Sequence, residues 1–219
     1  MNEAYNIDCM NLMKTLPDKA FELAIVDPPY GIGANKMTLG NGKNKIFRGN
    51  NDWDKSAPSA EYFAELERVS KNQIIWGVNH FTETFHKNSP CWIFWDKGTG
   101  ENDFADGEFA YASFQTHARK FVYSWVGANA REKMEGRIHP TQKPVALYEW
   151  LLTHYAKQGD KILDTHLGSG RSRIAAYNLG FDFVGCEIDE DYFKAQEERF
   201  AAHTAQTSLF DGEGRLRST

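Results

Sequence analysis

Cysteine is scarce in this 219-residue chain, whose three residues of this type are Cys9, Cys91 and Cys186. They lie far apart and form no Cys-x-x-Cys pair, which argues against a disulfide framework or a zinc site and for a reducing compartment. The chain also lacks an apolar run of membrane-spanning length and a leader in which a basic segment precedes an apolar one. We therefore expect a cytoplasmic protein that needs no membrane and no metal.

Net positive charge is lacking as well, since the formal net charge is −5. This total disfavours a nucleic-acid partner, but a total hides how charge is distributed. Two windows, 31–56 and 119–143, are net positive, and their candidate nucleic-acid contacts are Lys36, Lys43, Lys45, Arg48, Arg131, Lys133 and Arg137. Taken alone, such windows are explained equally well by chance variation of a mixed surface charge.

Apolar segments of strand length alternate with segments of helical spacing along the chain. Strands are predicted at residues 5–7, 21–26, 72–77, 91–95, 120–126, 161–164 and 181–186, and helices at 9–16, 59–70, 144–157 and 171–179. Residues 97–118 fit neither pattern, and the chain from about residue 206 is polar. The alternation predicts one α/β domain over residues 1–205, with a mostly parallel sheet covered by helices on both faces and a disordered tail at 206–219.

A glycine-rich turn follows one of the predicted strands. The segment KILDTHLGSG, residues 161–170, places Asp164 at the strand end and Gly168 and Gly170 in the turn, where they let the backbone approach a ligand. The next strand ends at Glu187, at about the spacing from which an acidic side chain binds ribose hydroxyls. A third glycine and a Walker lysine are missing, which disfavours NAD and ATP. An acidic residue before the turn suits a cationic ammonium, which favours S-adenosylmethionine over a turn that binds nothing.

The stretch LAIVDPPYG, residues 23–31, ends a core strand with a turn that is poor in hydrogen-bond donors. Pro28 and Pro29 have no N–H, so the turn presents carbonyl oxygens, and an ionised Asp27 only accepts hydrogen bonds. Two acceptors aimed at one spot suit an exocyclic amino group, and Tyr30 offers a flat face on which a nucleobase can stack. The plainer interpretation, a Pro-Pro turn that only ends a strand, loses weight beside the glycine turn.

Together, DPPY at 27–30, HPTQKP at 139–144 and DTHLGSG at 164–170 resemble the motifs of the amino-methylating DNA methyltransferases. The order, with DPPY first and the glycine turn last, resembles the permuted β group, and the resemblance covers nearly the whole chain. It implies a permuted Rossmann-like methyltransferase fold with a mostly parallel seven-stranded sheet, S-adenosylmethionine as cofactor and double-stranded DNA as partner. It also implies a bacterial or phage-infected cell.

The resemblance implies methylation of a flipped-out base at an exocyclic nitrogen. A tetrapeptide that begins with Asp points to N6 of adenine, whereas Ser-Pro-Pro is commoner among the cytosine-N4 enzymes. Cytosine N4 remains an alternative, as does a non-catalytic nucleic-acid-binding subunit with the same fold. Protein glutamine methylases carry Asn first and place the cofactor turn before the catalytic one, so the order of motifs here disfavours them.

Site residues follow from the same resemblance. The catalytic tetrapeptide is Asp27, Pro28, Pro29 and Tyr30, with Asp27 also next to the cofactor. The cofactor-binding residues are Asp8 and Cys9 at the adenine amino group, Thr141 and Lys143 at the carboxylate, Asp164, Gly168, Ser169 and Gly170 at the methionine part, Glu187 at the ribose and Ile188 at the adenine ring. His139 is not needed as a general base in this reaction, and His166 is expected to be packed or hydrogen-bonded rather than to carry a proton. Asn79 and His80 could lie near the base pocket, but a core or strand-end role is favoured for them.

Two features depart from the family pattern. Family members usually carry Pro-Phe after the acid of the glycine-turn motif, whereas this chain has Thr165-His166. Little length remains for a separate target-recognition domain, so we expect the loops at about 31–54 and 98–137 to read the DNA, or a homodimer to supply a second surface. The recognition site and the biological role, whether restriction-modification, phage protection or regulation, do not follow from the sequence.

Overall fold

The computed structural model describes residues 1–33, 54–99, 105–124, 138–139 and 141–207. In this part of the chain the strands are β1 (Asn2–Asn6), β2 (Phe21–Val26), β3 (Ser70–Trp76), β4 (Trp92–Asp96), β5 (Gly107–Ala112), β6 (Arg119–Val122), β7 (Lys161–Asp164) and β8 (Asp182–Glu187). The helices are α1 (Cys9–Thr15), α2 (Ala60–Val69), α3 (Val145–Tyr155), α4 (Arg171–Asn178) and α5 (Glu190–Thr207), with a short 3₁₀ turn η2 (Val78–His80). No helix of the described residues is long and apolar enough to cross a membrane.

The described strands form one sheet in the order β1-β8-β7-β2-β3-β5-β4-β6. All neighbours in it pair in parallel except at β5, which runs antiparallel to both β3 and β4. The predicted α/β class with a mostly parallel sheet is confirmed, but the sheet has eight strands rather than seven. The additional strand is β5, whose sequence GEFAYA has no regular apolar alternation. Its pairing with two neighbours, rather than its own pattern, makes it a strand.

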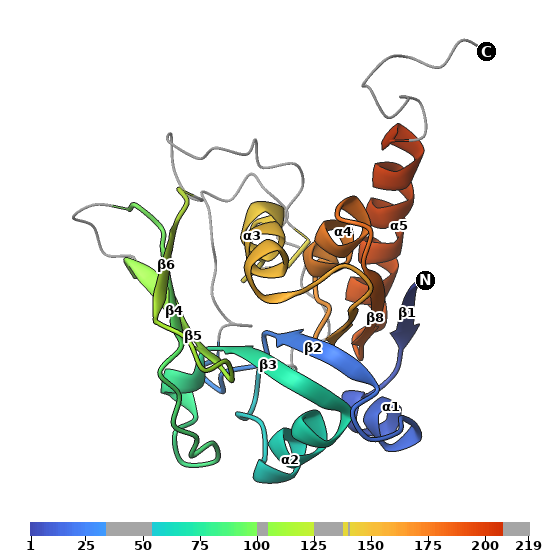
Figure 1. Cartoon of the computed structure of the whole chain (residues 1–219). Helices are drawn as coiled ribbons and strands as arrows, with labels where there is room; N and C mark the ends of the chain where they lie inside the picture. The colour runs from blue at the N-terminus through green and yellow to red at the C-terminus, as the bar shows by residue number, and fades with distance from the viewer. Residues whose placement is uncertain (34–53, 100–104, 125–137, 140, 208–219) are drawn as a thin grey trace.

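Helices cover both faces of the sheet, with α1 and α2 on one face and α3, α4 and α5 on the other (Figure 1). The core strand β2 shows how the sequence produces this arrangement. Leu23 and Ile25 pack in the cluster that contains α3, whereas Ala24 and Val26 pack in the cluster that contains α2. Because successive side chains point to opposite faces, an unbroken apolar strand is buried on both.

The C-terminal helix α5 extends beyond the predicted domain end at residue 205, because it continues to Thr207. Sequence patterning does not predict this helix, since charged residues dominate its exposed turns. Its start is nevertheless well specified, because Asp189 Oδ1 accepts hydrogen bonds from the backbone N–H groups of Asp191 and Tyr192. Tyr192 and Gln196 are the buried residues that attach it to the domain.

The strand order brings distant parts of the sequence to one edge of the sheet. β7 lies between β8 and β2, and β1 lies beside β8, so their carboxyl ends are neighbours. These strands end at or just before Asp8, Asp27, Asp164 and Glu187. Ligands of open parallel sheets bind at this edge, and here it carries the four acidic residues that the sequence marks as site residues.

Candidate active site

One cavity of about 580 Å³ connects the DPPY turn with the glycine turn. This volume lies within the range of small-molecule and cofactor sites, about 300–1,000 Å³. Of the predicted site residues, those that line the cavity are Asp8, Cys9, Asp27, Pro28, Pro29, Tyr30, Thr141, Lys143, Gly168, Ser169, Glu187 and Ile188. Asp164 and Gly170 are not among the lining residues. The two turns therefore share one space, as the chemistry inferred from each of them requires.

Tyr30 is held in a defined position at the end of β2. Its hydroxyl donates a hydrogen bond to Asp27 Oδ1 over 2.7 Å. Its ring stacks on the imidazole of His80, with centroids 4.9 Å apart and planes 13° from parallel. Gly77, with a positive φ of +73°, makes room for the ring, because a Cβ at this position would lie 2.1 Å from Tyr30 Cε1. Asn79 and His80 follow the end of β3, are exposed and line the cavity, so of the two expected roles the strand-end position holds and the core position does not.

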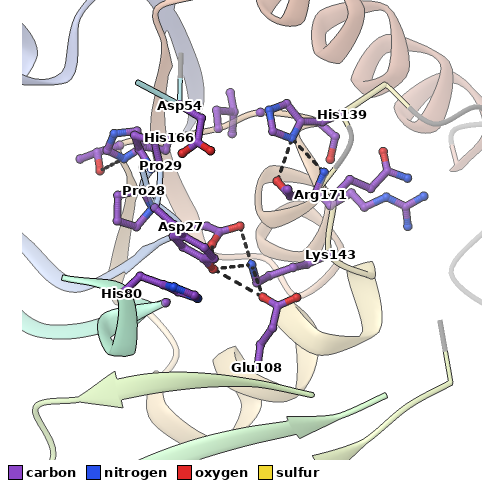
Figure 2. A pocket seen from close by; sticks show the side chains of 18 of the residues that line it. Asp27, Pro28, Pro29, Asp54, His80, Glu108, His139, Lys143, His166 and Arg171 are labelled. Carbon is purple, nitrogen blue, oxygen red and sulfur yellow. Dashed lines mark hydrogen bonds and ion pairs between the residues drawn. The ribbon is translucent and has the colours of Figure 1, made fainter. Parts of the chain in front are cut away.

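A set of four charges lies beneath the DPPY turn. Lys143 Nζ lies 2.5 Å from Asp27 Oδ2 and 2.9 Å from Glu108 Oε2, so one ammonium bridges two carboxylates (Figure 2). Lys97 Nζ lies 2.7 Å from the other oxygen of Glu108. The Lys143 side chain is 1% exposed, and its ammonium lies 5.3 Å from the centroid of the Trp76 ring. Two positive and two negative groups thus compensate one another at the base of the cavity.

Burial and pairing act against each other on the pKa values of these groups. Burial and the charge of Glu108 raise the pKa of Asp27, while Lys143 opposes the rise. Burial likewise raises the pKa of Glu108, but Lys143 and Lys97 together outweigh it and lower the pKa to about 2. For Lys143, burial lowers the pKa and the two carboxylates raise it by more, so the net shift is upward. Lys143 therefore stays an ammonium, and together with the hydrogen bond from Tyr30 it opposes the rise in the pKa of Asp27.

Lys143 has contacts that its predicted role did not include. It was predicted to approach the cofactor carboxylate, which stays a prediction, and the structure shows its ammonium shared between Asp27 and Glu108. Thr141, predicted for the same task, has its hydroxyl 3.0 Å from His139 Nδ1. Burial lowers the pKa of His139 to about 3, with Lys143 contributing, so this imidazole is neutral and unsuited to carry a proton near neutral pH.

The glycine turn is braced by the two acidic residues that flank it. Glu187 accepts hydrogen bonds from the N–H of Gly168, over 2.8 Å, and from the N–H of Asp189. The Asp164 carboxylate accepts from the hydroxyl of Ser172 and from the N–H of His166. Asp164 thus shapes the turn from behind, while Glu187 reaches its cavity side.

Thr165 and His166, which depart from the family pattern, take part in a buried hydrogen-bond chain. The Thr165 hydroxyl lies 2.7 Å from the Tyr62 hydroxyl and 3.0 Å from His166 Nδ1. Burial lowers the pKa of His166 to about 4. The expectation that this histidine packs rather than carries a proton agrees with this geometry. Tyr62 comes from α2, so the chain ties that helix to the glycine turn.

Residues of the first helix and of the rim complete the cavity. Asp8 caps α1, since its Oδ1 accepts from the N–H groups of Met10 and Asn11. Burial, with the charge of Asp8, raises the pKa of the neighbouring Cys9 thiol to about 12, which disfavours the thiolate near neutral pH. Ile188 is 62% exposed at the rim.

Several residues of the cavity were not identified from the sequence. Lys97 and Glu108 both line the cavity and both lie in the segment 97–118, whose sequence has no recognisable pattern. Asp54 accepts a hydrogen bond from the N–H of Gly31 over 2.8 Å, which fixes the start of the loop after DPPY. The predicted DNA contacts Lys36, Lys43, Lys45, Arg48, Arg131, Lys133 and Arg137 lie outside the described residues.

A family model described as DNA methylase, N6_N4_Mtase, matches residues 83–198, which is more than half of the chain. The chain belongs to the N6/N4 DNA methylase family. It is therefore an S-adenosylmethionine-dependent DNA methyltransferase, and the resemblance read from its motifs is confirmed.

Individual relatives agree in fold and extent with this N6/N4 DNA methylase. The chain is 24% identical over 244 residues to the type II methyltransferase M.HinfI of Haemophilus influenzae, covering 91% of this chain and 68% of that protein. The crystal structure of an M1.HpyAVI–SAM complex aligns over 91% of this chain and 100% of that one, at 21% identity and a TM-score of 0.57. The PvuII DNA methyltransferase, which is cytosine-N4-specific, aligns over 91% and 86%, at 13% identity and a TM-score of 0.59. At these identities the structural matches establish the fold.

Replacing Gly77 with alanine tests the placement of Tyr30. We expect Gly77→Ala to displace the tyrosine ring and to lower the rate of DNA methylation at least tenfold, with the affinity for S-adenosylmethionine little changed. Gly159→Ala is the matched control, because Gly159 also has a positive φ, +93°, but a Cβ at this position would meet nothing within 4 Å. The control should keep the wild-type rate. Equal rates for both variants in single-turnover assays would contradict the assignment.

The stability of the domain should depend on the protonation of Asp164. Burial raises the pKa of this carboxyl to about 7, so the folded protein holds a proton there that the unfolded chain has lost. Stability from this group is full below the unfolded pKa, about 3.9, and is lost as the pH rises through about 7. Relative to Asp164→Asn, the wild-type free energy of unfolding should fall by roughly 2–3 kcal/mol from pH 5 to pH 8. Urea denaturation at both pH values measures this difference, and Asp191→Asn, at an exposed carboxylate on α5, is the control. A constant difference would show that Asp164 is ionised throughout.

Proposed function

We propose that this DNA methyltransferase transfers the methyl group to N6 of adenine, after the base has been flipped out of a duplex into the cavity beside Asp27. The observation that carries the proposal is the Asp-first DPPY turn, whose Asp27 and Tyr30 line the same cavity as the glycine turn. Flipping costs a few kcal/mol, and the base is then bound by its polar edge and by stacking.

Asp27 and the carbonyl oxygen of Pro28 are the proposed acceptors for the two hydrogens of the amino group. Accepting both hydrogens localises the nitrogen lone pair, which is otherwise delocalised into the purine ring, and leaves it free to attack. This role requires an ionised Asp27, since a protonated carboxyl is also a donor. The neighbouring ammonium of Lys143 favours that ionised form.

Tyr30 is the proposed stacking partner of the base. Its ring stacks on the imidazole of His80, and its hydroxyl donates a hydrogen bond to Asp27, so the ring is held in position. A ring that is already positioned loses little further freedom when the base arrives, so the positioning of base and acceptors supplies much of the rate enhancement.

The proposed cofactor residues lie at the other end of the cavity. When bound, S-adenosylmethionine supplies an activated methyl group on a sulfonium. The acidic lining from Asp8 and Glu187 suits a ligand that carries positive charge and sugar hydroxyls. Gly168 and Ser169 allow close approach of the turn. In this proposal one domain over about residues 1–207 holds the cofactor and the base, and the loops at 31–54 and 98–137, alone or with a second subunit, contact the DNA.

Mass spectrometry of nucleosides tests the proposed product. Unmethylated genomic DNA incubated with the protein and S-adenosylmethionine should yield N6-methyladenine, and Asp27→Ala should yield none while its affinity for the cofactor stays within about threefold of wild type. The mutation removes an acceptor of the base and spares the glycine turn.

Other outcomes separate the alternatives. N4-methylcytosine would keep the mechanism and change the base. Cofactor binding without any methylated base would contradict the proposal. Methylation by Asp27→Ala at the wild-type rate would remove Asp27 from its role, whichever base is modified.

A further inference from the structure

Glu108 occupies a position in the active site that the proposed chemistry does not yet explain. It comes from β5, the strand with reversed direction, and its carboxylate lies on the far side of Lys143 from Asp27 (Figure 2). One oxygen lies 2.9 Å from Lys143 Nζ and 3.5 Å from the Tyr30 hydroxyl. The other lies 2.7 Å from Lys97 Nζ. Glu108 thus contacts both side chains that donate to Asp27 without contacting Asp27 itself.

The arrangement presents a conflict at Asp27. Both of its oxygens already have a donor, since Tyr30 donates to Oδ1 and Lys143 Nζ lies 2.5 Å from Oδ2. A neutral amino group would have to compete with an ammonium for the same carboxylate, and a charged donor makes the stronger hydrogen bond. The amino nitrogen also gains positive charge as it takes up a methyl group, and an uncompensated ammonium nearby would oppose this.

We propose that Glu108 is a positioning residue that holds Lys143 when the amino group of the target base takes its place on Asp27. The Lys143 ammonium, which Asp27 and Glu108 share in the free protein, then pairs with Glu108 alone, so it always has a carboxylate partner. Asp27 then keeps its full negative charge for the amino group. The inference rests on the proposed role of Asp27, and it adds a second carboxylate that makes the exchange possible without leaving a buried charge unpaired.

Lys97 stabilises the ionised form of Glu108. It pairs with Oε1 of Glu108 and leaves Oε2 to accept from Lys143. The titratable groups around Asp27 are Lys143, Glu108 and Tyr30, with Tyr148 on α3 and Asp164 on β7 further away. Lys143 is the only cation that the structure shows bound to Asp27 among the described residues, so the exchange has one donor and two acceptors.

A double-mutant cycle between Glu108 and Lys143 tests the proposal. Single-turnover methylation is measured for Glu108→Gln, Lys143→Met and the double variant, from pH 6 to pH 9. Glu108→Gln leaves Lys143 only Asp27 as a carboxylate partner, so its rate should fall about tenfold. Lys143→Met leaves two carboxylates facing each other, so its rate should be low at pH 7 and should recover as the pH rises.

The double variant distinguishes an exchange from a structural role. With both the competing ammonium and the second carboxylate removed, its loss of rate should be no larger than the greater of the two single losses. If Glu108 acted independently of Lys143, the two losses would multiply, and if the pair only supported the fold, the affinity for S-adenosylmethionine, measured by calorimetry, would fall in each variant. Multiplying losses, a wild-type rate for Glu108→Gln, or a fall in cofactor affinity that accounts for the lost rate would overturn the proposal.

Controls separate this inference from the proposed function. Glu65→Gln removes a carboxylate that is also paired with a cation, Arg68, and that is similarly exposed, 21% against 24% for Glu108. Glu65 does not line the cavity, so this variant should keep the wild-type rate and pH profile. Methylated adenine from the wild-type protein sustains the proposed function whatever the variants do, whereas the behaviour of the cycle decides the role of Glu108 alone.

Discussion

The active site depends on one ammonium that is shared by two carboxylates. Parallel strands bring acidic residues together at their carboxyl edge, and burial there would protonate them without a counter-charge. Lys143 supplies this charge from a segment outside the sheet, and Lys97 supplies a second one. Because removing one partner of a buried pair leaves a charge that costs several kcal/mol, the members of this set constrain one another's positions.

The acidic residues at this edge of the sheet have two different roles. Asp27 faces the cavity, and Pro28 and Pro29 after it have no N–H to donate, which suits this turn to accept from an amino group. Asp164 and Glu187 instead accept hydrogen bonds from the glycine turn, so hydrogen bonds within the protein hold that side of the cavity in shape. Tyr62 on α2 also braces this turn through Thr165 and His166, the two positions at which the family pattern has Pro-Phe. A polar chain and an apolar contact are thus two ways to support one turn.

Much of this could be predicted from local sequence. The strand at 21–26 and the helix that begins at Cys9 agree with prediction, because their apolar spacing and caps are local signals. The DPPY and glycine turns were identified for the same reason. Local sequence did not identify strand β5, helix α5 or the role of Glu108, because these depend on neighbours. Strand β5 is stabilised by pairing with β3 and β4. Glu108 is paired with Lys97 and Lys143, and neither pairing has a recognisable signal in the sequence.

The sequence by itself determined the fold class, the two turns and the family, because each follows from short segments whose properties do not depend on distant residues. Only the tertiary structure decided which residues surround Asp27. Lys143 was predicted from its motif to contact the cofactor, and the structure adds that its ammonium lies 2.5 Å from the Asp27 carboxylate. For His80 a core or strand-end role was favoured over a place near the base pocket, and the structure stacks it on Tyr30. Spacing along the chain cannot reveal such contacts, because they form where the ends of non-consecutive strands meet and where buried charges must find partners.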